Sequence, residues 1–208
     1  MLRNKKARSF QFLWPYLLLA AALAGGVLWY ESSQVPGLGT VVTTGQADVG
    51  GAFRLVDQTG AVKTDKDFRG RAMLLYFGYS FCPDVCPTTL SVMSQALDRM
   101  GADKNRIVPV FITIDPERDT PKVLKDYMSA FGPQFVGLTG SPAAIKAVEK
   151  KYHVYAVKKP IDPNNPKRGY GMDHSSVIYL MGPDGRMIGF YDEAISPDDL
   201  AKDLKAKI

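Results

Sequence analysis

Apolar and polar positions divide the chain into one long uncharged stretch and a series of short segments with helix or strand periodicity. The uncharged stretch, residues 9–30, reads SFQFLWPYLLLAAALAGGVLWY. A run of this length can cross the hydrocarbon core of a membrane, which needs about 20 apolar residues. Aromatic side chains flank its two ends, as they do at membrane interfaces: Trp14, Tyr16, Trp29 and Tyr30. The pattern predicts a transmembrane anchor over residues 12–30.

A signal peptide that is removed after export is the alternative. Ala22-Leu23-Ala24 matches the A-x-A pattern of a cleavage site, but the apolar run continues to Tyr30, which favours an uncleaved helix. Residues 1–11 carry basic and no acidic side chains, and such flanks stay in the cytoplasm. We therefore expect a single pass through the inner membrane, with the N-terminus in the cytoplasm. Residues 31–47, rich in Gly, Ser and Thr, read as a flexible tether to a domain in the periplasm or in the equivalent intermembrane space.

Residues 48–208 have the periodicity of one α/β domain. Continuous apolar runs predict strands buried on both faces at residues 72–77 and 107–114. Helical spacing predicts helices at residues 88–100, 121–130, 142–151 and 197–207. Shorter or alternating segments predict strands at residues 52–56, 135–138, 154–157, 175–181 and 186–191. This order calls for a mixed central sheet with helices on both faces and an N-terminal β-hairpin extension, the layout of a thioredoxin-like fold.

Residues 158–172 stand apart because they contain three prolines and two glycines and have no apolar period. They predict a long irregular loop, and loops longer than about 12–15 residues are often functional. The loop ends immediately before Asp173 and His174.

The formal charge of +5 constrains the partners. Four of these charges lie in the first 30 residues, so the rest of the chain is close to neutral. Binding of DNA or RNA depends on basic side chains that meet phosphates, and the folded part has no such surplus. We predict no nucleic-acid partner.

Candidate chemistry centres on Cys82 and Cys86, the only two cysteines. They lie between a buried strand and a helix, at a sheet edge where ligands and redox groups gather. Amides at a helix N-terminus lower the pKa of thiols, and two thiolates favour Cu(I) or zinc. A spacing of four residues on a helical turn also permits a somewhat strained disulfide. The pair can therefore bind a metal when reduced, exchange disulfides, or form a plain structural bond, although exchange enzymes usually have C-x-x-C.

One of the two histidines is needed for a third ligand. His174 can reach the sheet edge that faces the cysteines, and Asp173 beside it is a candidate to orient the imidazole ring. An imidazole also allows Cu(II). His153 lies between a helix end and a short strand, where a role at the helix C-terminus is expected. An ordinary surface position is the alternative for His174.

Three carboxylates occur in the segment from Asp115 to Pro121, DPERDTP. The simplest interpretation is a capped loop, with Asp119 or Thr120 at the N-cap of a helix and Pro121 in its first position. Arg118 would then neutralise its neighbours. An acidic site is the alternative, and a role in shaping the cysteine site or meeting a partner stays open.

Three motifs together closely resemble the Sco/SenC family: FCPDVCP from Phe81, DPERDTP from Asp115 and DHS from Asp173. The start of the domain at residues 50–60 is also similar, and the resemblance spans about residues 47–207. It implies a membrane-anchored thioredoxin-like domain that binds copper, as Cu(I) or Cu(II), through Cys82, Cys86 and His174. It also implies a role in building the CuA centre of cytochrome c oxidase, with the CuA-bearing subunit as partner.

The resemblance leaves two roles open. A copper chaperone, which is not an enzyme, would deliver the metal, whereas a thiol–disulfide reductase would keep the CuA cysteines reduced. An upstream copper donor or thiol reductant is an expected second partner. Peroxide reduction, known on the same fold, is disfavoured because the residues just before Cys82 lack the threonine usual there. Four basic residues beside His174 suggest a docking surface for an acidic partner: Lys158, Lys159, Lys167 and Arg168.

Overall fold

The computed structural model describes residues 49–208. The basic segment at residues 1–11, the anchor at 12–30 and the tether at 31–47 lie outside the described residues and stay predictions. Within residues 49–208, no helix has both the length and the apolar character needed to cross a bilayer.

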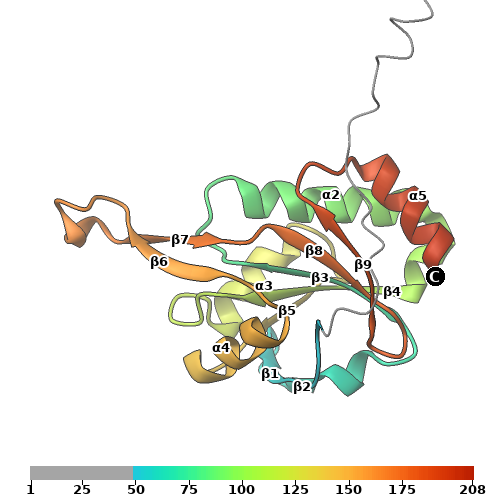
Figure 1. Cartoon of the computed structure of the whole chain (residues 1–208), viewed down its shortest axis with the longest axis horizontal. Helices are drawn as coiled ribbons and strands as arrows, with labels where there is room; N and C mark the ends of the chain where they lie inside the picture. The colour runs from blue at the N-terminus through green and yellow to red at the C-terminus, as the bar shows by residue number, and fades with distance from the viewer. Residues whose placement is uncertain (1–48) are drawn as a thin grey trace, which may run out of the picture. The chain divides into compact units, whose positions relative to one another are not determined.

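Seven strands form one mixed sheet (Figure 1). β3, β4 and β5 are parallel to one another, whereas β1, β2, β8 and β9 run antiparallel to their neighbours. Every residue of β3 and β4 is buried, as their continuous apolar runs predict. Across the sheet the order is β2 (Val62–Thr64), β1 (Arg54–Asp57), β5 (Val136–Thr139), β4 (Ile107–Thr113), β3 (Ala72–Gly78), β8 (Val177–Met181) and β9 (Met187–Asp192).

Within residues 49–208, four α-helices pack on this sheet: α2 (Val85–Met100), α3 (Pro121–Ser129), α4 (Pro142–Lys151) and α5 (Pro197–Lys207). Figure 1 shows α2 and α5 on one face and α4 on the other. Successive residues of β3 reach both layers, since Tyr76 contacts Cys86 of α2 whereas the ring of Phe77 packs on Tyr152, just after α4. The predicted thioredoxin-like fold with a mixed sheet and an N-terminal hairpin is therefore confirmed.

Most helix starts follow from local capping. The hydroxyl of Ser141 accepts from the Ala144 amide at 3.2 Å at the start of α4, and Ser196 has the same role in α5. Helix α2 differs, because it begins at Val85 and not at the predicted Thr88. Cys86 therefore lies inside the first helical turn.

The irregular loop predicted for residues 158–172 is wrong at both of its ends and correct only for the connection at residues 161–169, which lies outside the strands. The structure has an antiparallel ribbon there, made of β6 (Ala156–Pro160) and β7 (Tyr170–His174), which is separate from the main sheet. Figure 1 shows the ribbon extending beyond the sheet. Four of the five residues of β6 are exposed, so this strand needs no apolar alternation. The short strand expected at residues 154–157 corresponds to β6, which begins two residues later, at Ala156.

Candidate metal centre

Three predicted residues from two distant parts of the chain meet at one end of the sheet. Cys82 lies in the loop after β3, Cys86 in the first turn of α2, and His174 at the end of β7. Their ligand atoms all lie within 4.8 Å of one another. Cys86 Sγ lies 3.5 Å from His174 Nε2, and the Cys86 amide lies 3.4 Å from Cys82 Sγ. Both cysteines are free thiols here, and the disulfide predicted between them stays a prediction.

The two thiols have different environments. Cys86 is fully buried, whereas Cys82 is partly exposed. Burial raises the pKa of the Cys86 thiol to about 12, contrary to the lowering that a helix N-terminus predicts, because the loss of hydration outweighs the hydrogen bonding from the Tyr79 backbone. A metal that binds Cys86 must therefore displace its proton.

The His174 ring is held with Nε2 toward the sulfurs. Its Nδ1 lies 3.0 Å from the carbonyl oxygen of Ser175, and a proton donated there leaves the Nε2 lone pair free for a metal. The rings of Tyr79 and Tyr76 stand edge-on to the imidazole, at 5.9 and 6.4 Å between centroids. Asp173 is exposed, and consecutive strand residues point to opposite faces. The orienting contact expected from Asp173 is thus made by the Ser175 carbonyl.

His153 takes no part in this cluster. It is exposed and follows Tyr152, the C-cap of α4, with a φ of 55°. This is the left-handed conformation that commonly ends a helix, so the predicted role at a helix C-terminus is confirmed.

Gly78, at the end of β3, was missed by the sequence analysis. A Cβ at this position would lie 2.8 Å from Cys86 Sγ and 3.0 Å from the rings of Phe111 and Tyr76. The sulfur occupies space that any other residue would fill. A glycine at the end of a buried strand was the available signal, because it often marks a close approach.

The segment after β4 supports the loop at residues 79–84 that carries Cys82, called the cysteine loop below. Asp119 is fully buried, and its carboxylate accepts from the amide and hydroxyl of Ser80 and from the hydroxyl of Thr113. Burial raises the pKa of Asp119. Thr120, not Asp119, is the N-cap of α3, and Arg118 pairs with Asp115. The capped-loop interpretation is confirmed, and Asp119 in addition anchors the backbone two residues before Cys82.

The comparisons with known proteins agree with this geometry. Residues 41–208 match the family model described as SCO1/SenC. The chain belongs to the SCO1/SenC family. It is 41% identical over 194 residues to protein sco1 of Schizosaccharomyces pombe, covering 89% of this chain and 73% of that protein. It is 40% identical over 156 residues to protein SenC of Rhodobacter capsulatus, covering 74% and 68%.

Solved structures extend the match to three dimensions. The structure of Bradyrhizobium japonicum ScoI with copper bound superposes with a TM-score of 0.70 at 44% identity, covering 77% of this chain and 99% of that one. Arabidopsis thaliana ScoI with copper bound gives 0.72 at 38% identity, covering 76% and 97%.

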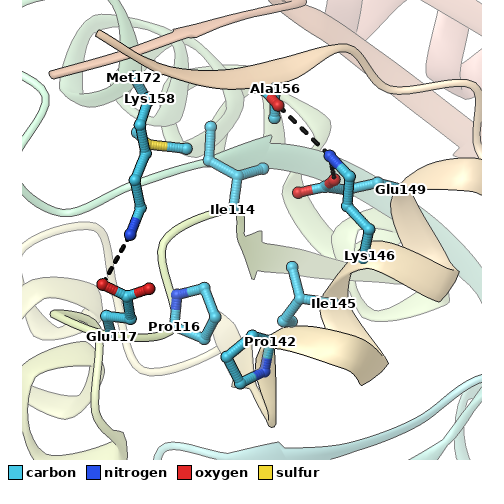
Figure 2. A pocket seen from close by; sticks show the side chains of 10 residues that line it. All are labelled: Ile114, Pro116, Glu117, Pro142, Ile145, Lys146, Glu149, Ala156, Lys158 and Met172. Carbon is cyan, nitrogen blue, oxygen red and sulfur yellow. Dashed lines mark hydrogen bonds and ion pairs between the residues drawn. The ribbon is translucent and has the colours of Figure 1, made fainter.

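A pocket of about 170 Å³ lies between the ribbon and α4 in this SCO1/SenC domain (Figure 2). Two ion pairs stand at its edges: Lys158 with Glu117 at 2.6 Å, and Lys146 with the buried carboxylate of Glu149 at 2.8 Å. Lys146 Nζ also reaches the carbonyl of Ala156 at 3.4 Å. None of the three candidate ligands lines the pocket. These contacts brace β6 against the body of the domain.

The four basic residues expected to form a docking surface are not equivalent. Lys158 is paired with Glu117, and Arg168 lies 3.5 Å from Asp162. Lys159 and Lys167 are exposed and have no ion pair within the described part of the chain. These two carry the remaining positive charge of the ribbon.

Proposed function

We propose that this protein is a membrane-anchored copper chaperone that delivers copper to, and matures, the CuA centre of cytochrome c oxidase. The observation that carries the proposal is the convergence of two thiols and one imidazole within 4.8 Å. Two thiolates suit Cu(I), and the added imidazole suits Cu(II). The copper-bound structures of related ScoI proteins support copper as the cargo. BsSco, at 24% identity a relative in fold, is described as belonging to the Sco family of cytochrome c oxidase assembly proteins.

The chain's own residues account for loading and release. Cys82 and Cys86 give up protons as they take the metal, and His174 supplies Nε2. Tyr76 and Tyr79 stand edge-on to the imidazole and pack beside it. If a partner's disulfide accepts two electrons and two protons from these cysteines and becomes a dithiol, Cys82 and Cys86 form a disulfide, both thiolates are lost, and copper would be released.

Metal titration of the purified chain tests the assignment of the ligands. We expect about one copper per chain, because the described residues offer one cluster of this kind. Cys82→Ala and Cys86→Ala should lose both oxidation states of copper. His174→Ala should lose Cu(II) preferentially, since Cu(I) can remain on two sulfurs.

His153→Ala is the matched control, because it removes the other histidine and leaves the cluster intact. X-ray absorption should show two sulfur ligands and one nitrogen in the wild type. Wild-type Cu(II) affinity in the His174→Ala variant would disprove the three-ligand assignment.

A thiol–disulfide reductase for the CuA cysteines is the second candidate. The partly exposed Cys82 with the buried Cys86 behind it favours this chemistry. The Cys82 thiolate would attack a partner disulfide and form a mixed disulfide. Cys86 would then attack Cys82 sulfur, which releases the partner as a dithiol and leaves this protein oxidised.

Rescue experiments in a deletion strain separate the two roles. Recovery of oxidase activity with added copper favours delivery, whereas recovery with a thiol reductant favours reduction. His174→Ala adds a second criterion, because reduction needs only the two cysteines. Complementation by this variant would favour the reductase.

The proposal includes a single-pass inner-membrane topology, with residues 12–30 as an uncleaved anchor and the domain in the periplasm. The apolar run and its basic flank support this topology. An alkaline phosphatase fusion after Ile208 should be active, and the intact mass of the mature protein should include residues 1–30. An inactive fusion, or a mass that begins after residue 24, would contradict it.

A further inference from the structure

Arg118 lies between the two parts of the chain that supply the candidate ligands. Its guanidinium carbon is 3.8 Å from the ring centroid of Tyr170 and 4.8 Å from that of Phe81. Tyr170 begins β7, the strand that ends at His174, and Phe81 directly precedes Cys82. One side chain therefore contacts both the histidine strand and the cysteine loop.

Polar contacts fix this position. Arg118 Nη1 donates to the carbonyl of Tyr170 at 2.9 Å, and Nε pairs with the fully buried carboxylate of Asp115. The Tyr170 hydroxyl donates to the other oxygen of the same carboxylate at 2.9 Å. The three groups form a closed set in which each one contacts the other two.

The stacked rings also compensate for incomplete hydrogen bonding of the Arg118 guanidinium. Arg118 Nη2 is buried and has no hydrogen-bond partner within the described chain. Aromatic faces can compensate a cation that has lost its water. A third ring, that of Tyr79, lies 5.7 Å from the guanidinium and stands edge-on to His174. Arg118 thus reaches the surroundings of the imidazole both along β7 and through Tyr79.

We propose that Arg118 is a positioning residue that holds β7 against the cysteine loop, so that the His174 imidazole meets the two sulfurs. It is not itself a ligand. The inference rests on the proposed copper binding. Because Cu(I) can remain on two thiolates while Cu(II) needs the imidazole, Arg118 governs the affinity for Cu(II) and not that for Cu(I).

The main test is Arg118→Lys in the full chain. Lysine keeps a positive charge beside Asp115 but lacks the planar fork that reaches Tyr170 and stacks on the rings. We expect a roughly 10–100-fold loss of Cu(II) affinity, the range for partners that orient metal ligands. The electron paramagnetic resonance and visible spectra of bound Cu(II) should change, and Cu(I) affinity should stay at the wild-type value.

Two further variants control for effects on folding. Arg118→Met combined with Asp115→Asn removes the ion pair without leaving a buried carboxylate unpaired, and it should lose Cu(II) in the same way. Arg69→Lys is the matched control. Arg69 also pairs with a nearly buried aspartate, Asp65, at 3.0 Å, but it precedes β3 at the end of the strand opposite the site. This control should keep wild-type binding of both oxidation states.

The outcomes separate this inference from the proposed function. If the wild type binds no copper, or His174→Ala keeps its Cu(II), copper binding through these ligands is wrong and the inference falls with it. If His174→Ala loses Cu(II) while both folded Arg118 variants keep wild-type Cu(II) affinity and spectra, only the inference is overturned. Equal losses of Cu(I) and Cu(II), or failure of both variants to fold, would also overturn it by assigning Arg118 to the fold.

Discussion

The Cys86 sulfur lies so close to Gly78 that a side chain at residue 78 would collide with it. The position of the sulfur therefore requires a glycine there. We predict that Gly78→Ala displaces the Cys86 thiol and weakens both Cu(I) and Cu(II) binding. Overpacking of a core costs about 1–3 kcal/mol, so the free energy of unfolding should also fall. Competition with a chromophoric Cu(I) chelator and a denaturant titration measure the two effects.

Gly171→Ala is the control for this substitution. Gly171 lies in β7, and a Cβ there would meet nothing closer than the Tyr79 hydroxyl at 3.6 Å. The copper affinity of the Gly171→Ala variant should stay near the wild-type value. Equal affinities of Gly78→Ala and the wild type would show that the close approach has no bearing on the site.

Asp57, in the N-terminal hairpin, predicts a specific pH dependence of stability. Burial acts to raise the pKa of this carboxyl, but hydrogen bonds from Thr59 and Ala61, with Lys63 nearby, outweigh it and lower the pKa below 3.8. The folded state therefore favours the charged form. This stabilisation is present above the unfolded pKa and is lost as the pH falls through the folded pKa.

Asp57→Asn keeps an oxygen that can accept these bonds but does not titrate. We expect it to be less stable than the wild type at pH 7, with the difference shrinking as the pH falls below 3.8. Urea denaturation at several pH values measures this difference. A difference that does not vary with pH would contradict the role of the Asp57 charge.

At the scale of elements, α4 and α5 begin and end where the sequence predicts. In both, a serine cap and a proline in the first turn mark the start locally. The ribbon could not be predicted in this way. Its strands are held by backbone pairing from Ala156 with His174 to Pro160 with Tyr170. Of their ten residues only Ala156 is buried, so no apolar alternation marks them in the sequence.

The tip of the ribbon, residues 161–169, offers a test of what positions His174. We predict that replacing the tip with Asn-Gly keeps Cu(II) binding, because the strand pairing and the contacts of Tyr170 with Arg118 lie outside the tip. Asn-Gly suits a two-residue hairpin turn. Copper titration and thermal denaturation measure the outcome.

A variant with a Gly-Ser sequence of unchanged length at residues 161–169 is the control for the shortened loop. Loss of Cu(II) in the shortened protein but not in this control would show that the tip supports the site.

If the ribbon docks an acidic partner, reversing the charges of Lys159 and Lys167 should weaken association with that partner and leave copper binding unchanged. Unchanged association would exclude these two residues from docking.

At the scale of the whole molecule, Cys86 and His174 are 88 positions apart in the sequence. A metal held by both joins the first turn of α2 to β7, the strand that leads into β8. We predict that copper raises the melting temperature. Free ligand at 100 times its dissociation constant adds about 2.7 kcal/mol, and about 2–4 °C accompanies each kcal/mol in a domain of this size.

Differential scanning calorimetry under controlled oxidation state checks this prediction. Cu(II) should give a smaller increase with His174→Ala than with His153→Ala. An equal increase in the two variants would mean that the metal does not link β7 to the cysteines.

The sequence predicts the metal site only in part. Cys82, Cys86 and His174 were identified because their residue types are rare in this chain and their motifs are specific. Gly78 and the stacking of Arg118 were not, because both depend on which segments the fold brings together. Nothing in the sequence positions of these residues indicates that Arg118 lies against Phe81 and Tyr170.

The unequal exposure of the two thiols sets an order of events. Cys86 is enclosed by the sheet and α2, so an approaching protein meets the sulfur of Cys82 first. A copper ion passed to a partner would exchange its Cys82 bond before its Cys86 bond, and a disulfide between the two cysteines would be attacked at the same sulfur. Copper transfer and thiol–disulfide exchange would therefore both begin at Cys82, and blocking this residue alone would prevent both.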